Sequence, residues 1–271
     1  MISKRTLGRM ALAATVAATL IACGKKEEAK PAAAAPAASE LTIAYITNGN
    51  TNEGWTLING GAKKAGSVPG VKFIELAAEK GELSKQLAIV EDMITRKVSA
   101  IAIAPVDSAG IAPAINKALA AGIPVIAVDT GITGANITSY VATDNIKAAN
   151  VQGKWAAGEI KDGDTVIYVT GDQGQSTGQE RKKGFVDALN AGRKNVKIVE
   201  VATTWDQTMA QNGVEAALRA NPNAKVIACA WDGGALGAKA ALMAAGKKPG
   251  DVKIAGFDGS PGGLDMMKQG W

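Results

Sequence analysis

From residue 40 onward, short apolar runs alternate with longer segments in which apolar residues recur every three or four positions. The short runs are rich in Val, Ile and Ala, which is typical of strands covered on both faces, and the longer segments predict amphipathic helices. The expected strands are 41–47, 71–76, 100–104, the run 124–131, an extended segment 137–143, 165–170, 196–202, 226–230 and 252–256. The expected helices are 55–66, 83–97, 108–121, 144–160, one starting at 177, one ending near 220, 234–245 and one starting at 260.

This order of elements predicts an α/β fold with two doubly wound parallel-sheet lobes joined by a hinge. We expect an N-terminal lobe over 40–142 and a C-terminal lobe over 143–271, with the segment 137–143 as the first crossing between them. Internal sequence similarity supports two related lobes. IAIAPVDSAG at 101–110 parallels VIACAWDGGA at 226–235, and an alanine-rich helix and a strand follow each. Chance similarity between alanine-rich helices is the alternative.

Two of the predicted strands end on an acidic residue and a glycine turn. Asp129 ends the strand PVIAV, and Asp258 ends the strand KIAGF. Open parallel sheets hold their ligands at the carboxyl ends of their strands, so both carboxylates are candidates for one site shared by two lobes. The alternative is that each aspartate only forms a turn, for which Asp is a common residue.

The first 39 residues have the pattern of an export signal followed by a spacer. Lys4, Arg5 and Arg9 precede the apolar run 10–22, which is too short to span a bilayer and predicts a secretory signal peptide over 1–22. The segment 23–39 contains charge, proline and alanine without amphipathic periodicity, which predicts a disordered linker.

Composition excludes several kinds of chemistry. The 271-residue chain has no histidine, which removes the commonest general base and imidazole metal ligands. Of the 2 cysteines, Cys23 lies in the leader and Cys229 in the apolar run VIACA, so no disulfide framework or thiolate metal cluster is expected. Enzymes that use Lys, Asp or Glu remain possible on composition alone. We expect no metal site and no cofactor, and the binding-protein hypothesis below assigns no catalytic residue.

Charge and aromatic content point to a small neutral ligand. The net charge is +5, but the leader and linker supply most of it, which leaves a nearly neutral body and argues against a nucleic-acid partner. The aromatic residues are 5 Trp, 3 Tyr and 3 Phe, a Trp-rich set that suggests a polar, stacking ligand surface.

The body from about residue 40 to 271 resembles the periplasmic sugar-binding proteins of the ribose/galactose-binding type. The residues that carry the resemblance are 43–62, the strand end at Asp129, GQERKKGF at 178–185, AWDGGALGA at 230–238 and GFDGSPGG at 256–263. The resemblance implies a periplasmic binding protein type I-like fold, a sugar or polyol ligand, an ABC permease as membrane partner, and a monomer. It also implies that the fold is C-terminally truncated here, since the family continues beyond a segment like MMKQGW.

Residue by residue, the resemblance implies a ligand-binding set. The first-strand loop matches Asn48 and Asn52, and Trp55 would stack on a sugar face. Asp129 and Asp258 would accept hydrogen bonds from ligand hydroxyls, and Trp205 would supply a second stacking face.

At three positions the sequence departs from the family pattern. Thr130 and Gln179 stand where the family commonly has arginine, and Trp231 stands where it has asparagine. Because they occupy family site positions, all three are also expected to bind the ligand. These departures make ribose itself an unexpected ligand and favour a less hydroxylated sugar, a sugar alcohol or a cyclitol. Glu180 and Arg181 are interpreted as a solvated or structural pair, and Trp155 as a core residue.

LIAC at 20–23 resembles the lipobox of bacterial lipoproteins, which implies that Cys23 becomes a lipid anchor in the cell envelope.

The leading hypothesis is a binding protein that closes on its ligand and delivers it to a permease. The alternatives are a sensory protein that engages a chemoreceptor or sensor kinase, and an exported hydrolase that uses Asp129 and Asp258 as a carboxylate pair. A repressor is disfavoured, because a secretion signal occupies the place of a DNA-binding domain.

Overall fold

The computed structural model describes residues 40–49 and 52–271, which belong to one compact unit spanning Ser39–Trp271. The strands are β1 (Leu41–Thr47), β2 (Val71–Ala77), β3 (Ala100–Ile103), β4 (Val125–Val128), β5 (Ser139–Val141), β6 (Thr165–Val169), β7 (Lys197–Val201), β8 (Val226–Cys229) and β9 (Lys253–Ala255). The helices are α1 (Glu53–Gly66), α2 (Leu83–Thr95), α3 (Ala112–Ala120), α4 (Asn145–Glu159), α5 (Ser176–Gly192), α6 (Gln207–Ala220), α7 (Asp232–Ala244) and α8 (Pro261–Lys268), with a short 3-10 helix η1 (Glu79–Gly81). The predicted signal peptide (1–22), linker (23–39) and anchor Cys23 lie outside the described residues.

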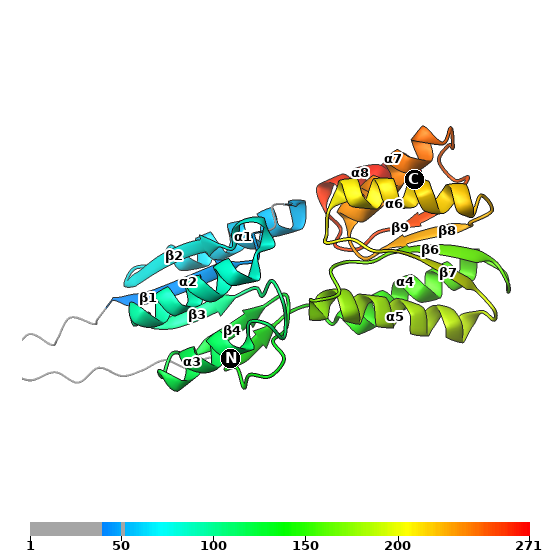
Figure 1. Ribbon diagram of the computed structural model, residues 1–271. Helices are drawn as coiled ribbons and strands as arrows, with labels where there is room; N and C mark the ends of the chain where they lie inside the picture. Colours follow the sequence, from blue (N-terminus) through cyan, green and yellow to red (C-terminus); the bar gives the residue numbers. More distant parts are fainter. Residues whose placement is uncertain (1–39, 50–51) are drawn as a thin grey trace, which may run out of the picture. The chain divides into compact units, whose positions relative to one another are not determined.

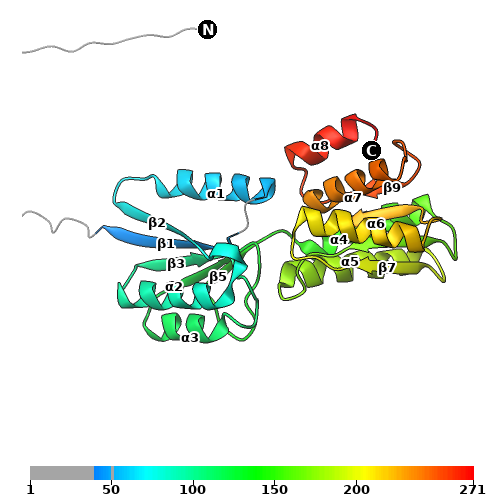
Figure 2. The same cartoon turned by 45° about the horizontal axis from the view of Figure 1, so that its top comes forward.

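The first five strands form one parallel sheet in the order β2-β1-β3-β4-β5. Strand β1 lies inside this sheet, with Ile43 opposite Phe73 of β2 and Ala100 of β3. Figure 2 shows α1 on one face of the sheet and α2 and α3 on the other. The continuous apolar runs of the sequence are therefore covered by helices, as expected for a parallel sheet. We call this sheet with α1–α3 the N-terminal lobe.

The remaining strands form a second parallel sheet in the order β7-β6-β8-β9. All four residues of β8 are buried, because α6 to α8 lie on one side of the sheet and α4 and α5 on the other (Figure 1). Its core contains Tyr168 stacked on Phe185, with ring centroids 4.6 Å apart. We call this sheet with α4–α8 the C-terminal lobe.

These two sheets confirm the predicted α/β fold class with two doubly wound parallel-sheet lobes. The boundary predicted between residues 142 and 143 falls between β5 and α4, and it stays a prediction. The segment 137–143, expected to be extended, contains strand β5, which pairs with β4, and its role as the first crossing stays a prediction. One local expectation was wrong, because α3 begins at Ala112 rather than Ser108. Ser108 contacts the C-terminal lobe instead, where its hydroxyl accepts from the Ser176 N–H at 2.9 Å.

Helices α4 and α5 pack very closely, and glycines make this possible. A Cβ at Gly153 of α4 would collide with the carbonyl oxygen of Phe185, and one at Gly184 of α5 would collide with the carbonyl oxygen of Ile146. The two backbones therefore touch at these positions. This close contact holds α5 firmly on its lobe.

The expectation that Trp155 is a core residue was wrong. The buried face of α4 consists of small and polar residues such as Ala149, Gln152 and Ala156. Trp155 lies off this face, is 38 % exposed, and lines a hollow of about 750 Å³ beside β9, together with Met267. No helix within the described ranges is long and apolar enough to cross a membrane.

We expect Gly153→Ala to lower the free energy of unfolding by about 2 kcal/mol, because the added methyl group must push α4 away from α5. Gly158→Ala is the matched control. Gly158 lies on the same helix with nothing within 4 Å of an added Cβ. Its substitution should be neutral or stabilising by about 0.5–1 kcal/mol through helix propensity. Urea unfolding of both variants measures the difference, and equal effects would contradict the close packing.

Candidate ligand-binding pocket

A pocket of about 390 Å³ lies at the carboxyl ends of the strands and is lined by residues of both lobes. Parallel sheets place their functional side chains at this edge. Six of the residues predicted from sequence line it: Asn52, Trp55, Asp129, Trp205, Trp231 and Asp258. The two strand-end aspartates are thus brought to one pocket from different sheets.

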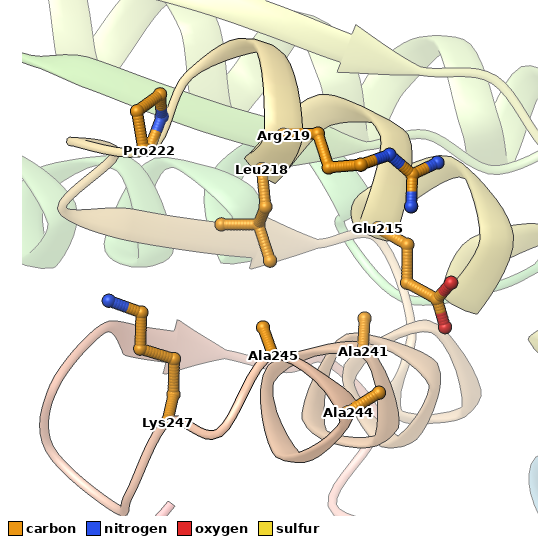
Figure 3. A pocket seen from close by; sticks show the side chains of 8 residues that line it. All are labelled: Glu215, Leu218, Arg219, Pro222, Ala241, Ala244, Ala245 and Lys247. Carbon is orange, nitrogen blue, oxygen red and sulfur yellow. The ribbon is translucent and has the colours of Figure 1, made fainter.

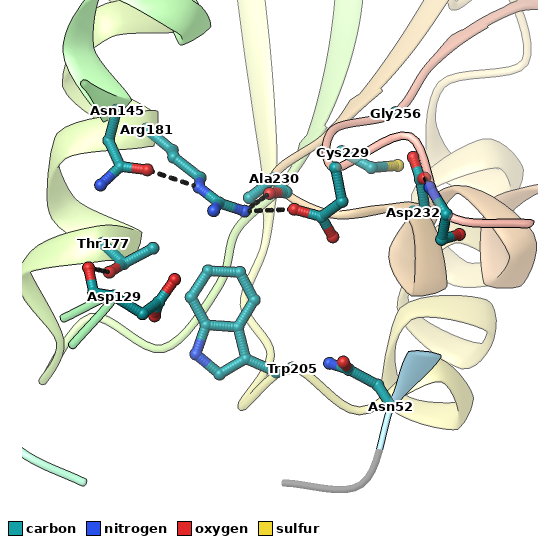
Figure 4. Close-up of polar contacts among 12 residues, drawn as sticks. Asn52, Asp129, Asn145, Thr177, Arg181, Trp205, Cys229, Ala230, Asp232 and Gly256 are labelled. Atoms are coloured by element: carbon teal, nitrogen blue, oxygen red, sulfur yellow. Dashed lines mark hydrogen bonds and ion pairs between the residues drawn. The ribbon is translucent and has the colours of Figure 1, made fainter. Parts of the chain in front are cut away.

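Arg181, on the second turn of α5, is the central polar group of the pocket wall. It is 6 % exposed, and its Nη1 donates to the carbonyl oxygen of Ala230 at 2.7 Å and to Oδ1 of Asp258 at 3.1 Å. Its Nε donates to Oδ1 of Asn145 at 3.0 Å, and Figure 4 shows the contacts of the guanidinium with Asn145 and Ala230. Its Cζ also lies 3.9 Å from the ring centroid of Phe257. Arginine suits this position because its planar fork can donate and stack at once.

Both carboxylates are affected by burial. Burial raises the pKa of Asp258 to about 6, although the positive charge of Arg181 opposes the shift. Burial also raises the pKa of Asp129, against the charge of Arg181 and hydrogen bonds from the hydroxyls of Thr130 and Thr177. The site thus keeps two acceptors in a partly dehydrated place, where hydrogen bonds to them are strong.

The indoles are held in fixed positions. Trp205 packs against Gly171, where a Cβ would collide with its ring, and its Nε1 donates to Oε1 of Gln175 at 2.8 Å. Trp231 meets Trp205 edge to face, with centroids 5.5 Å apart. Trp55 enters from the N-terminal lobe at the start of α1, whose first turn is capped by Oδ1 of Asn52. Aromatic faces in fixed orientation are the kind of surface on which a sugar ring stacks.

Three pocket residues have backbone angles in the left-handed region. The φ angles are +63° at Asp129, +64° at Trp205 and +103° at Asp258. Non-glycine residues in this region cost of order 1–3 kcal/mol each and are found mainly at functional sites. The strain is balanced by side-chain bonds, such as the one from Trp205 to Gln175.

Hydrogen bonds join the two lobes beside the pocket, at the N-terminus of α5. The Ser176 hydroxyl accepts from the Gly131 N–H at 2.8 Å, and the hydroxyls of Thr130 and Thr177 lie 2.9 Å apart. Gln175 donates through Nε2 to the carbonyl oxygen of Val106 at 3.1 Å. Since the other end of the Gln175 amide accepts from an indole of the pocket, it ties the pocket wall to the N-terminal lobe.

The remaining sequence-predicted residues do not line the pocket. Asn48 is 5 % exposed at the end of β1. Thr130 is fully buried, and its hydroxyl donates to Oδ2 of Asp129 at 2.9 Å, so it holds the carboxylate in place. Gln179 is exposed and donates to the carbonyl oxygen of Gln173 at 2.7 Å. Placing Gln179 in the pocket was wrong, because it lies on the outer side of α5.

Sequence reasoning missed Arg181, Gln175 and Phe257, which all line the pocket. The interpretation of Glu180 and Arg181 as a pair was wrong, because Glu180 accepts from Asn145 while Arg181 lies in the pocket. A signal was present: Arg181 lies four residues after Thr177, on the buried face of α5. An arginine on such a face requires partners.

Another hollow, of about 300 Å³, lies between α6 and α7 (Figure 3). Its floor consists of Leu218 and alanine side chains such as Ala241 and Ala245, and it has no aromatic lining residue. It contains none of the residues predicted from sequence. Among the described residues there is also no group of three or more His, Cys, Asp or Glu side chains that could hold a metal ion.

Two doubly wound lobes that line one polar and aromatic pocket define a two-lobed ligand-binding protein. The chain belongs to the periplasmic binding protein domain family, whose model matches residues 43–271. This confirms the resemblance that the sequence motifs indicated.

Several proteins of this kind are similar to the chain. The ribose import binding protein of Salmonella typhimurium is 33 % identical over 236 residues, which cover 87 % of this chain and 78 % of that protein. A periplasmic solute-binding protein from Actinobacillus succinogenes, solved with bound D-allose, is 32 % identical with a TM-score of 0.76, covering 85 % and 82 % of the two chains. The Caulobacter myo-inositol binding protein bound to myo-inositol is 28 % identical with a TM-score of 0.80, covering 86 % and 80 %.

The raised pKa of Asp258 predicts a pH-dependent stability. The folded protein, with a pKa of about 6 against the ordinary 3.8, holds this proton more tightly than the unfolded chain. The contribution to the free energy of unfolding is therefore fully present below pH 3.8 and is lost as pH rises through about 6. We expect the free energy of unfolding of wild type minus that of Asp258→Asn to be larger at pH 5 than at pH 7 in urea unfolding. A smaller difference at pH 5 would mean that the Arg181 charge outweighs burial.

Proposed function

We propose that this protein is the extracytoplasmic substrate-binding component of an ABC transporter, and that it captures a sugar or sugar-alcohol-like ligand in the pocket. One observation carries this proposal: two carboxylates, a guanidinium and three indoles from both lobes surround a single pocket of about 390 Å³. The similar proteins named above, whose names or bound ligands include ribose, D-allose and myo-inositol, support the same ligand class.

The pocket chemistry fits a neutral polyhydroxylated ring. Asp129 and Asp258 accept hydrogen bonds from ligand hydroxyls, which donate readily to ionised carboxylates. Nη2 of Arg181 has no hydrogen-bond partner among the residues that the structure describes, so it can donate to a ligand oxygen. The faces of Trp55 and Trp205 cover the apolar C–H surfaces of the ring. A charged ligand fits less well, because both signs of charge already line the pocket.

The position of Arg181 changes the ligand expected from sequence. Arg181 supplies a rigid hydrogen-bond donor fork to the pocket, two residues after Gln179, where the family commonly has arginine. The sequence argument against a well-hydroxylated sugar is therefore weaker. Trp231 fills the space near Trp205 with a second indole and leaves less room than a small amide. We therefore propose a compact ring, either a sugar or a cyclitol.

Capture and delivery follow from the two-lobed construction. The ligand bridges side chains of both lobes, so its binding favours the closed arrangement and excludes water from the carboxylates. The closed protein then presents a defined surface to the permease. The residues act by binding and orientation, and no bond of the ligand is broken.

We further propose that the mature protein is tethered in the periplasm. The signal-like segment 1–22 directs export, and Cys23 becomes a lipid-modified first residue that anchors the linker 23–39 to a membrane. The pocket needs no second copy of the chain, and we propose a monomer.

A sugar panel tests the proposed function. We expect D-ribose, D-allose, myo-inositol or D-fucose to change the tryptophan fluorescence of the wild-type protein with micromolar affinity. Trp205→Ala should weaken that binding by more than about ten-fold through the lost stacking face. Trp155→Ala is the matched control, because Trp155 lies outside the pocket. Absence of binding to all four compounds at millimolar concentration would refute the ligand class.

The anchor is tested separately by Cys23→Ser. In a Gram-negative expression host we expect wild type in the membrane fraction and the variant in the soluble periplasmic fraction, because the variant lacks the acylated thiol. Metabolic labelling with a fatty-acid probe should mark wild type alone. A wild-type protein found soluble and unlabelled would contradict the anchor without affecting the sugar site.

A further inference from the structure

A second contact joins the lobes at the edge of the pocket. Oε2 of Glu53, the first residue of α1, accepts a hydrogen bond from the N–H of Gly262 at 2.9 Å. Gly262 lies in the first turn of α8, so the bond links the N-terminal lobe to the C-terminal lobe. It involves helices α1 and α8, and thus other elements than the contacts at the start of α5.

The first turn of α8 needs this partner. A helix leaves its first N–H groups without acceptors inside the helix. Within the C-terminal lobe the Ser260 N–H donates to Oδ2 of Asp232, and the Gly263 N–H donates to Oγ of Ser260. Pro261 has no N–H. The N–H of Gly262 is satisfied by Glu53 of the other lobe, where the helix dipole also favours a negative charge.

The contact lies directly beside the ligand pocket. On α1, Asn52, Gly54 and Trp55 flank Glu53 and line the pocket. On the other side, Asp258 and Ser260 line the pocket and precede α8. When the lobes separate to admit or release a ligand, this bond must break.

We propose that Glu53 and the first turn of α8 form a clasp that holds the lobes closed over the occupied pocket and slows ligand release. The proposal rests on the proposed function, since it assumes that a ligand occupies the pocket. Glu53 is a positioning residue here, because it acts through the arrangement of the lobes and does not itself line the pocket.

The expected size follows from the kind of bond. A charge-assisted bond at a partly exposed helix N-terminus favours the closed form by about five-fold. Loss of the carboxylate should therefore raise the rate of ligand release about five-fold and leave the association rate nearly unchanged. High salt screens such a bond, so the difference should shrink between 0.01 M and 1 M salt.

Amide hydrogen exchange tests the clasp without a ligand. In Glu53→Ala we expect the Gly262 N–H to exchange several-fold faster than in wild type, measured by NMR. The Gly263 N–H is an internal control, because its acceptor Ser260 belongs to the same helix cap and is not altered. Equal exchange of Gly262 in both proteins would show that the clasp does not form in solution.

Stopped-flow tryptophan fluorescence with the tightest-binding sugar of the panel tests the effect on release. Glu53→Ala should release the sugar about five-fold faster, and Glu53→Gln, which keeps an acceptor without charge, should lie between it and wild type. Glu159→Ala, which removes an exposed carboxylate at the end of α4, should match wild type. Sugar binding with unchanged release in Glu53→Ala would overturn the clasp and leave the proposed function intact. If wild type binds no sugar, the proposed function fails, and Gly262 exchange still decides whether the contact exists.

Discussion

A buried guanidinium organises the C-terminal wall of the pocket. An arginine side chain that is only 6 % exposed would be very unfavourable without partners, because its charge has left water. Arg181 obtains them from three separate segments: the carboxylate of Asp258 after β9, the carbonyl oxygen of Ala230 after β8, and Asn145 at the start of α4. The requirement to satisfy one side chain thus fixes the relative positions of two strand-end loops and the start of a helix. The same cation moderates the pKa of both pocket carboxylates.

The strained backbone at the pocket becomes understandable in this setting. Asp129, Trp205 and Asp258 all have positive φ angles, and each has a side chain fixed by a specific bond. The hydroxyl of Thr130 holds Asp129, the amide of Gln175 holds Trp205, and Arg181 holds Asp258. These bonds fix the directions of two acceptors and one stacking face before any ligand arrives. Such preorganisation lowers the entropy lost on binding.

The fold could be predicted from sequence because its signals are local. Runs of Val, Ile and Ala between amphipathic helices reveal parallel strands whatever their partners, and a strand end locates Asp129 and Asp258 without knowledge of the sheet order. The resemblance to a known family added the stacking positions Trp55 and Trp205. The N-terminal 39 residues lie outside the described structure, so the export signal and the lipid anchor stay predictions.

The sequence placed individual side chains wrongly where their position depends on the exact face of a helix or on contacts with residues far away in the chain. Gln179 and Arg181 are two residues apart and therefore point in very different directions on α5. Assigning Gln179 to the pocket thus assigned Arg181 to a different face of the helix. The buried positions of α5 include Thr177, Arg181 and Phe185, and this spacing was readable in principle. The role of Gln175 was not, because its acceptor on Val106 lies 69 residues away in the chain. Trp155 shows the converse case, since an indole in an alanine-rich helix packs inward only if its own face is covered.

Helix α5 connects the junction between the lobes to the pocket. Its first turn bonds to the N-terminal lobe through Ser176 and Thr177, and one turn later it carries Arg181. Its close contact with α4 at Gly184 leaves little freedom for bending between these points. A helix held in this way moves as a rigid body. A ligand that displaces the guanidinium therefore also displaces the hydrogen bonds between the lobes, so ligand binding and lobe movement are coupled through α5.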